Sequence, residues 1–270
     1  MSRGVTLDHV GVVGQDLGAL AAQYEGLGFT LTPRAVTGDG RIENRCIMLR
    51  QGYLELMALA PGGSSATLSR MLARYTGAHI IALAVDDMAS SAERLRRAGF
   101  VCSGVEFSER TIDATDPAAL RAHFAHLPVP TQPEARINLI HHLTPALLWQ
   151  ERFLRHSNHA VALKEVVLAV AAPAESAARF SRLAGCLAVP DVEGGYALTL
   201  PRGRIRLLPP DAFAAPPPAI PSIISIRLRT DDAAKSITRL LAATAIPHIA
   251  THATVTTHPT ISGGVTLIFT

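Results

Sequence analysis

The sequence is poor in cysteine, with only Cys46, Cys102 and Cys186 among its 270 residues. The three are far apart, odd in number and free of any CxxC spacing. Disulfide frameworks and zinc–cysteine sites use paired, closely spaced cysteines, so the sequence argues against both. We expect three buried thiols in a reducing cytosol.

The sequence also contains few lysines and carries little net charge. The only lysines are Lys164 and Lys235, the formal net charge is +3, and the arginines are scattered rather than gathered into a basic run. We therefore expect no nucleic-acid partner. No uncharged apolar run reaches the ~18 residues of a membrane span, and Asp8 and His9 interrupt the first apolar stretch, so no signal peptide is expected. These absences predict a soluble cytoplasmic protein without a membrane partner.

Hydrophobic residues are abundant, at 48% against 17% charged, which is enough for a sizeable core. They form a repeat in which a strand rich in Val, Ile and Leu is followed by a polar break, an amphipathic helix and a small or apolar stop. Strand and helix of the four copies are predicted at 7–13 and 17–27, 78–85 and 88–97, 163–170 and 174–183, and 222–229 and 233–243.

Further strand-like segments follow the helices. They lie at 29–34, 45–50 and 53–59 in the first copy, at 101–107, 136–143 and 147–153 in the second, at 196–200 and 205–208 in the third, and at 264–269 in the fourth. A polar insertion containing Pro117, Pro128, Pro130 and Pro133 interrupts the second copy. The unit is therefore βαβββ, and because one unit cannot bury both faces of its small sheet, units pair. We predict an α+β fold of four βαβββ modules paired into two cup-shaped mixed sheets, with residues 1–158 as the N-terminal pair and 159–270 as the C-terminal pair.

Several motifs accompany this repeat. They are Leu7-Asp8-His9-Val10, Glu43-Asn44-Arg45-Cys46, Gly52-Tyr53-Leu54-Glu55-Leu56, Gly77-Ala78-His79-Ile80, His141-His142-Leu143-Thr144-Pro145 and His156-Ser157-Asn158-His159-Ala160. A βαβββ repeat with these motifs resembles the vicinal oxygen chelate superfamily, and more narrowly its glyoxalase-like domain proteins. In the last motif, we expect Asn158 to cap a loop.

The resemblance implies a divalent metal at the centre of a cup, held by side chains from the first and last strands of two modules. It assigns His9 and Glu55 from the first module and His79 from the second as metal ligands. We expect Asp16 and Asp86 at helix starts, where a carboxylate can accept from free backbone N–H groups. Spacing supports the equivalence of the histidines, since His9 precedes Asp16 by seven residues (16 − 9) and His79 precedes Asp86 by seven (86 − 79). Imidazole and carboxylate ligands suit Fe, Mn, Zn or Ni and leave positions open for substrate oxygens.

Four more side chains complete the predicted site. Glu151 is the carboxylate nearest the expected last strand of the second module and is a candidate fourth ligand or catalytic group. Adjacent strand residues face opposite ways, so only one of two consecutive histidines can face the cup; we choose His142 as a substrate- or proton-handling residue. Arg45 and Trp149 are assigned to substrate binding. A buried Glu55 needs a partner, either the metal or Arg45.

The C-terminal pair lacks this set of side chains. The position matching His9 is Glu165 and the position matching His79 is Ile224 (231 − 7). We expect a degenerate pair without metal, which shapes the pocket, mediates a homodimer or stabilises the fold.

Two functions from different classes fit these residues. The first is a metal-dependent lyase, isomerase or ring-cleaving dioxygenase, in which the metal chelates vicinal oxygens of a small oxygen-rich substrate. The four-module length resembles extradiol dioxygenases, although those similar enzymes usually carry their metal in the C-terminal pair. The alternative is a metal-free small-molecule binding protein that uses the same cup. The aromatic content of 5% argues mildly against a stacking pocket for a large planar molecule.

Overall fold

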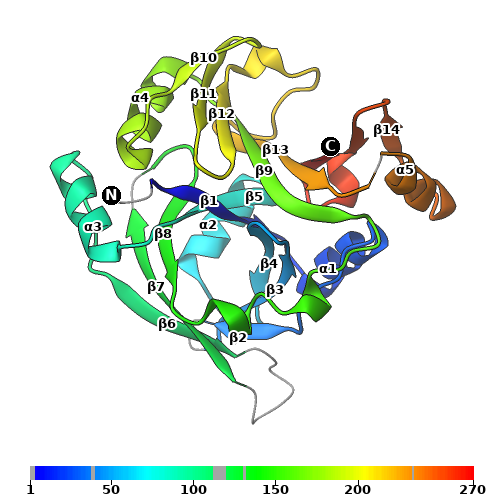
Figure 1. Cartoon of the computed structure of the whole chain (residues 1–270), viewed down its shortest axis with the longest axis horizontal. Coiled ribbons are helices and arrows are strands. Elements are labelled where there is room, and N and C mark those ends of the chain that lie inside the picture. The colour runs from blue at the N-terminus through cyan, green and yellow to red at the C-terminus, as the bar shows by residue number, and fades with distance from the viewer. Residues whose placement is uncertain (1–3, 38–39, 112–119, 130–131, 233) are drawn as a thin grey trace.

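The computed structural model describes residues 4–37, 40–111, 120–129, 132–232 and 234–270. The described strands form two eight-stranded mixed sheets, packed back to back (Figure 1). Among the described helices, none has the length and apolar character needed to cross a membrane.

The first sheet contains β1 (Thr6–Val13), β2 (Ala35–Thr37), β3 (Ile42–Met48), β4 (Tyr53–Leu59), β5 (Gly77–Ala84), β6 (Glu106–Thr111), β7 (Arg121–Val129) and β8 (Arg136–His142). The same half holds α1 (Leu17–Gly26), α2 (Ala66–Arg74), α3 (Met88–Arg97) and the short turns η1 (Pro145–Leu147) and η2 (Glu151–Phe153). The strand order is β2-β3-β4-β1-β5-β8-β7-β6. Its edge strands β2 and β6 approach each other, so the sheet curls almost into a barrel (Figure 1).

The second sheet repeats this plan with β9 (Ala160–Ala169), β10 (Val189–Asp191), β11 (Gly195–Thr199), β12 (Arg204–Leu208), β13 (Ser222–Thr230), β14 (His248–Ala250), β15 (Val255–Thr257) and β16 (Thr266–Phe269). It also has α4 (Pro173–Ala184), α5 (Ala234–Ala243) and the turns η3 (Pro210–Ala212) and η4 (Pro259–Ile261). In both sheets the first strand of each module runs parallel to its last, and the two first strands pair antiparallel. The predicted fold of four βαβββ modules paired into two mixed sheets is confirmed.

The second module differs in detail from its prediction. Its strands are β6, β7 and β8, whereas 147–153 forms 3₁₀ turns, because Pro145 fixes a turn directly after β8. Strand β7 lies within the stretch predicted to be an insertion. Of that insertion, Pro117 and Pro130 lie outside the described residues.

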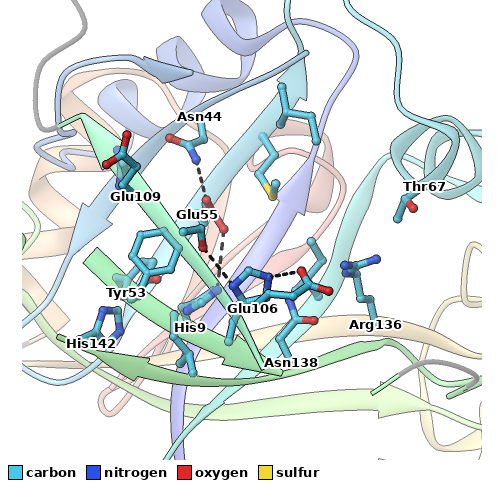
Figure 2. A pocket seen from close by; sticks show the side chains of 18 of the residues that line it. His9, Asn44, Tyr53, Glu55, Thr67, Glu106, Glu109, Arg136, Asn138 and His142 are labelled. Carbon is cyan, nitrogen blue, oxygen red and sulfur yellow. Dashed lines mark hydrogen bonds and ion pairs between the residues drawn. The ribbon is translucent and has the colours of Figure 1, made fainter. Parts of the chain in front are cut away.

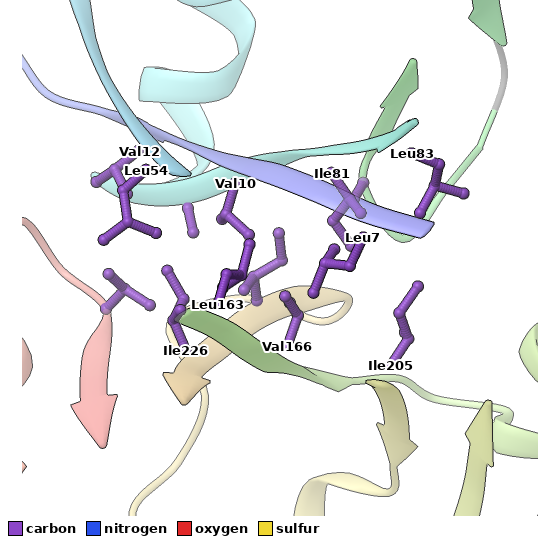
Figure 3. Packing of buried hydrophobic residues seen from close by; sticks show 14 of the residues in the cluster. Leu7, Val10, Val12, Leu54, Ile81, Leu83, Leu163, Val166, Ile205 and Ile226 are labelled. Carbon is purple, nitrogen blue, oxygen red and sulfur yellow. The ribbon is translucent and has the colours of Figure 1, made fainter. Parts of the chain in front are cut away.

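The convex faces of the two sheets share one hydrophobic core. Leu7, Val10 and Ile81 of the first sheet face Val166 and Ile226 of the second (Figure 3). All five are less than a tenth exposed. This leaves the concave side of each sheet free to form a separate cup.

Two polar residues define the starts of the helices that follow β1 and β5. The carboxylate of Asp16 accepts from the backbone N–H of Ala19 at 2.7 Å, and that of Asp87 accepts from Ser90 at 3.0 Å. These are N-caps of α1 and α3. The cap of α3 is therefore Asp87 and not the predicted Asp86, a shift of one residue that matters for the site.

Asn158 ties the connection between the two sheets to the first helix. Its Nδ2 donates to the carbonyl of Leu27, the C-cap of α1, at 2.8 Å, and its Oδ1 accepts from the N–H of Ala160 at 3.0 Å. The expected loop-capping role is confirmed, and this motif serves the fold rather than the cup.

A shared core predicts that the two sheets unfold together. Ile226→Ala, at a fully buried position, should lower the free energy of unfolding by about 2–5 kcal/mol, because it leaves a cavity between the sheets. Ile249→Ala, at a position 72% exposed, should change it by less than about 0.5 kcal/mol. Denaturant unfolding followed by circular dichroism and tryptophan fluorescence measures both. Two separate transitions, with only one affected by Ile226→Ala, would contradict the shared core.

Candidate functional site

A cavity of about 440 Å³ occupies the concave side of the first sheet. Its wall includes His9 from β1, Asn44 from β3, Glu55 from β4, and Asn138 and His142 from β8 (Figure 2). The cavity therefore collects side chains from both modules of the N-terminal pair.

Asp8 lies buried next to this cavity and holds two imidazoles. His9 Nδ1 and His142 Nε2 lie 2.8 Å and 3.1 Å from the same carboxylate oxygen, Oδ1. Burial alone raises the pKa of Asp8, but the hydrogen bonds from His142 and His9 outweigh it and hold the pKa well below its usual range. An ionised carboxylate only accepts, so each imidazole gives it an N–H. His9 Nε2 and His142 Nδ1 are left as the nitrogens not used by Asp8.

Glu55 lies opposite the second nitrogen of His9. Its Oε2 is 3.7 Å from His9 Nε2, and its Oε1 accepts from Asn44 Nδ2 at 2.7 Å. The expected protein partner, Arg45, is replaced by Asn44. The Oδ1 atom of Asn44 is buried and has no hydrogen-bond partner among the described residues.

His79 does not join His9, so the predicted convergence of the two histidines is wrong. In the β1–β5 pairing, His9 lies opposite Ala82, two residues after Ile80, and Ile80 lies opposite Gly11, two residues after His9. His9 and Ile80 therefore hold equivalent positions in the two strands. His79 is the extra residue of a β-bulge. Its Nε2–H donates to the carbonyl of Tyr75 at 2.8 Å, and its ring stacks on Tyr75 at 3.9 Å. Helix α3 is capped one residue later than predicted, by Asp87, and the residue seven positions before this cap is Ile80 rather than His79.

Asn138 holds the position in the second module that Glu55 holds in the first. In the parallel pair β1–β4, Gly11 lies opposite Glu55. In the parallel pair β5–β8, the equivalent residue Ala82 lies opposite Asn138. Asn138 Oδ1 is buried and unpartnered among the described residues. Within that same part of the chain, no group of three or more His, Cys, Asp and Glu side chains is placed to hold a metal ion.

Three other predicted site residues do not line this cavity. Arg45 lies on the face of β3 opposite Asn44 and pairs with Glu25 of α1 at 2.9 Å. Glu151 is exposed at the start of η2, because its segment is a turn and not a strand. These two assignments are corrected. Trp149 lies behind His142, with ring centroids 4.9 Å apart, and donates from Nε1 to a backbone carbonyl at 2.9 Å.

The sequence reasoning missed several residues of the site, of which four matter for its chemistry. Asp8 and Asn44 carried a usable signal, since each is a polar residue beside a predicted site residue in a mostly apolar strand. Asn138 and Arg110 of β6, which also lines the cavity, carried none. Their roles depend on strand register and on β6 reaching the edge of the first module.

The C-terminal cup contains a network of ion pairs. Glu165 takes the first-strand position and Arg206 the last-strand position of the equivalent module. Arg206 lies 2.5 Å from Asp191 and 4.0 Å from Glu165, which also accepts from Arg227 at 3.3 Å. These charges pair with one another, so the polar groups of this cup serve the structure of the C-terminal half.

Residues 7–184 match the family model described as a glyoxalase-like domain. This is more than half of the chain, so the protein belongs to the glyoxalase-like domain family, within the vicinal oxygen chelate superfamily. No protein with a curated description matches the sequence.

Solved structures share the fold at low identity. A hypothetical protein from Staphylococcus aureus is 11% identical with a TM-score of 0.69, over 98% of this chain and 99% of that one. The Mn(II)-bound glyoxalase from Novosphingobium aromaticivorans is 15% identical with a TM-score of 0.60, over 100% and 82%. A xylose isomerase-like TIM barrel/4-hydroxyphenylpyruvate dioxygenase fusion protein is 14% identical with a TM-score of 0.62, over 99% of this chain and 49% of that one. At these identities the likeness shows the fold.

Removing the Asp8 carboxylate should release both imidazoles. In the native protein we expect His9 protonated at Nδ1 and His142 at Nε2, and Asp8→Ala should give mixed tautomers and lower the free energy of unfolding by about 1–3 kcal/mol, because two buried donors lose their acceptor. Long-range ¹⁵N–¹H NMR spectra of the histidines test this. Asp231→Ala, which removes an exposed carboxylate 3.3 Å from His159, is the control and should leave both imidazoles unchanged. Unchanged tautomers in Asp8→Ala would refute the assignment.

The ion pairs of the C-terminal cup predict an acid-sensitive contribution to stability. The hydrogen bond from Arg206 lowers the pKa of Asp191 from 3.8 to about 2. A lowered folded-state pKa gives stability that is present above pH 3.8 and is lost as the pH falls toward 2. The difference in unfolding free energy between wild type and Asp191→Asn should therefore narrow by about 2 kcal/mol over that range. Denaturant melts at several pH values test this, and a constant difference would contradict it.

Proposed function

We propose that the protein is a glyoxalase-like enzyme that binds a small oxygen-rich molecule in the N-terminal cup, with His9 and Glu55 holding a divalent cation. The observation that carries the proposal is the 3.7 Å approach of His9 Nε2 to Glu55 Oε2, while His9 Nδ1 is committed to Asp8. A neutral imidazole bonded in this way turns a lone pair toward the carboxylate. A divalent cation held by these two acceptors would replace their repulsion by attraction.

The donor set fits a divalent cation, though with fewer strong ligands than predicted. A carboxylate bonded to the far nitrogen of a metal-binding imidazole, as Asp8 is to His9, is a common arrangement that fixes the ligand's tautomer. Asn138 Oδ1 supplies an unpartnered oxygen at the equivalent position of the second module. Ile80 at the remaining position donates nothing, which leaves places for oxygens of the bound molecule. A mixed N and O set suits Mn, Fe, Zn or Ni.

His142 supplies proton transfer in this proposal. Asp8 holds its Nε2–H, and its Nδ1 is buried and free of any partner among the described residues, so Nδ1 can accept a proton from the bound molecule. The edge of Trp149 keeps the ring in place. A divalent cation, when bound, acts as a Lewis acid on the substrate oxygens. A proton acceptor beside polarised oxygens supports a lyase or isomerase reaction over ring cleavage.

A metal-free binding protein is the second candidate. Two observations favour it. Ile80 occupies the position where the second histidine was predicted, and the described residues offer no third His, Cys, Asp or Glu ligand. The free polar atoms of the cup would then bind the molecule directly. The homodimer, the cytoplasmic location and the absence of a nucleic-acid partner remain predictions.

Metal content separates the two candidates. Protein purified without a histidine tag should contain close to one Mn, Fe, Zn or Ni per chain by mass spectrometry, or take it up on addition. His9→Gln and Glu55→Gln should each lose it, since each removes one of the two strong ligands. His79→Gln is the matched control, because it changes a buried histidine outside the cup and should retain the metal.

Two results would count against the metalloenzyme. One is a wild-type protein that neither contains metal nor binds added Mn(II). The other is a loss of metal in His79→Gln as large as that in His9→Gln. Either would leave the metal-free cup as the better account.

A further inference from the structure

Arg110 is a buried arginine in the wall of the cup. It comes from β6, is 6% exposed, and reaches from this edge strand to residues of the first module. There it donates from one terminal nitrogen to Cys46 Sγ at 2.8 Å and from the other to Thr32 Oγ1 at 3.1 Å. Its Nε has no hydrogen-bond partner among the described residues.

The positive charge of Arg110 has no paired anion. In the part of the chain that the structure describes, no carboxylate oxygen lies within 4.0 Å of its nitrogens. Burial raises the pKa of Cys46 to about 12, so this neighbour is a neutral thiol and a weak acceptor. The carboxylate of Glu55 acts on Arg110 only from farther away and accepts a hydrogen bond from Asn44.

The other cup shows how this chain treats a buried arginine that serves structure. Arg206 is also 6% exposed, and there Asp191 takes two of its N–H groups at 2.5 Å and 2.8 Å. Buried charges in proteins are normally paired in this way, because an uncompensated one is costly. The planar fork of an arginine is suited to a carboxylate, which it binds through two parallel hydrogen bonds.

We propose that Arg110 binds the carboxylate of the molecule that enters the cup, so that the natural ligand is a small organic acid. Asn44 Oδ1, an unpartnered acceptor in the same wall, adds the requirement for a donor on the ligand, such as a hydroxyl group. A small hydroxy acid meets both needs, and a cavity of about 440 Å³ accommodates one with a phenyl-sized substituent. The inference rests on the proposed function in taking the N-terminal cup as the ligand site, and it does not require the metal.

Lactate and mandelate, each compared with its methyl ester, test the proposal. The ester keeps the hydroxyl group and the shape but has no charge. Calorimetric titration of the wild-type protein should show at least one acid binding about tenfold or more tightly than its ester, since a charge-assisted hydrogen bond is lost. Arg110→Gln should abolish this preference, and Arg110→Lys should keep only part of it because the fork is lost. Arg136→Gln is the control, as it removes an exposed arginine of the same cavity and should leave the preference intact.

Several outcomes would overturn the proposal. They are equal binding of acid and ester, binding of neither acid, an unchanged preference in Arg110→Gln, or its loss in Arg136→Gln instead. The comparison of acid with ester uses only the wild type, so equal binding overturns the proposal even if Arg110→Gln fails to fold.

The titrations should be made on chelator-treated protein and again with Mn(II) added. Arg110-dependent binding of an acid to protein that takes up no metal supports this inference while the proposed metalloenzyme fails. If His9 and Glu55 hold metal but the protein shows no preference for an acid, the proposed metalloenzyme is supported and this inference fails.

Discussion

The antiparallel pairing of β1 with β5 decides what the N-terminal cup contains. Each strand carries one extra residue at a bulge, Asp8 in β1 and His79 in β5. A bulge adds one residue to a strand, so it changes which face of the sheet the neighbouring side chains point to. In β1 this places a carboxylate against the imidazole that follows it. In β5 it turns the histidine to Tyr75 and leaves Ile80 in the cup.

The two cups show opposite uses of buried polar groups on the same backbone plan. In the C-terminal cup, Glu165, Asp191, Arg206 and their neighbours satisfy one another. In the N-terminal cup, atoms of Asn44, Asn138, Arg110 and His142 are buried without partners among the described residues. Unpartnered polar atoms lower stability, and a fold tolerates them where a ligand completes them. This contrast is why we propose that a ligand binds in the cup of the first sheet.

The C-terminal pair has a clear physical task even though the charged groups of its cup pair with one another. The convex face of the first sheet is a continuous apolar surface, and the convex face of the second covers it (Figure 3). Without that cover, residues such as Val10 and Ile81 would face water. Because the second sheet covers only the convex face of the first, the cavity on the concave face remains open to a ligand.

The sequence by itself determined the four βαβββ modules, their pairing into two sheets and the position of His9 and Glu55 on the first and last strands of one module. These follow from hydrophobic periodicity, which local sequence carries directly. Sequence placed Arg45, Glu151 and His79 in the site, and the structure does not. Whether a strand residue faces the cup depends on bulges, on which aspartate caps a helix and on where a strand gives way to a turn, and each can shift a side chain to the other face. Asn138 belongs to the site because of its register opposite Ala82 of β5, and Arg110 only because β6 meets β2 of the first module in space. That meeting results from closure of the sheet, which no local pattern encodes.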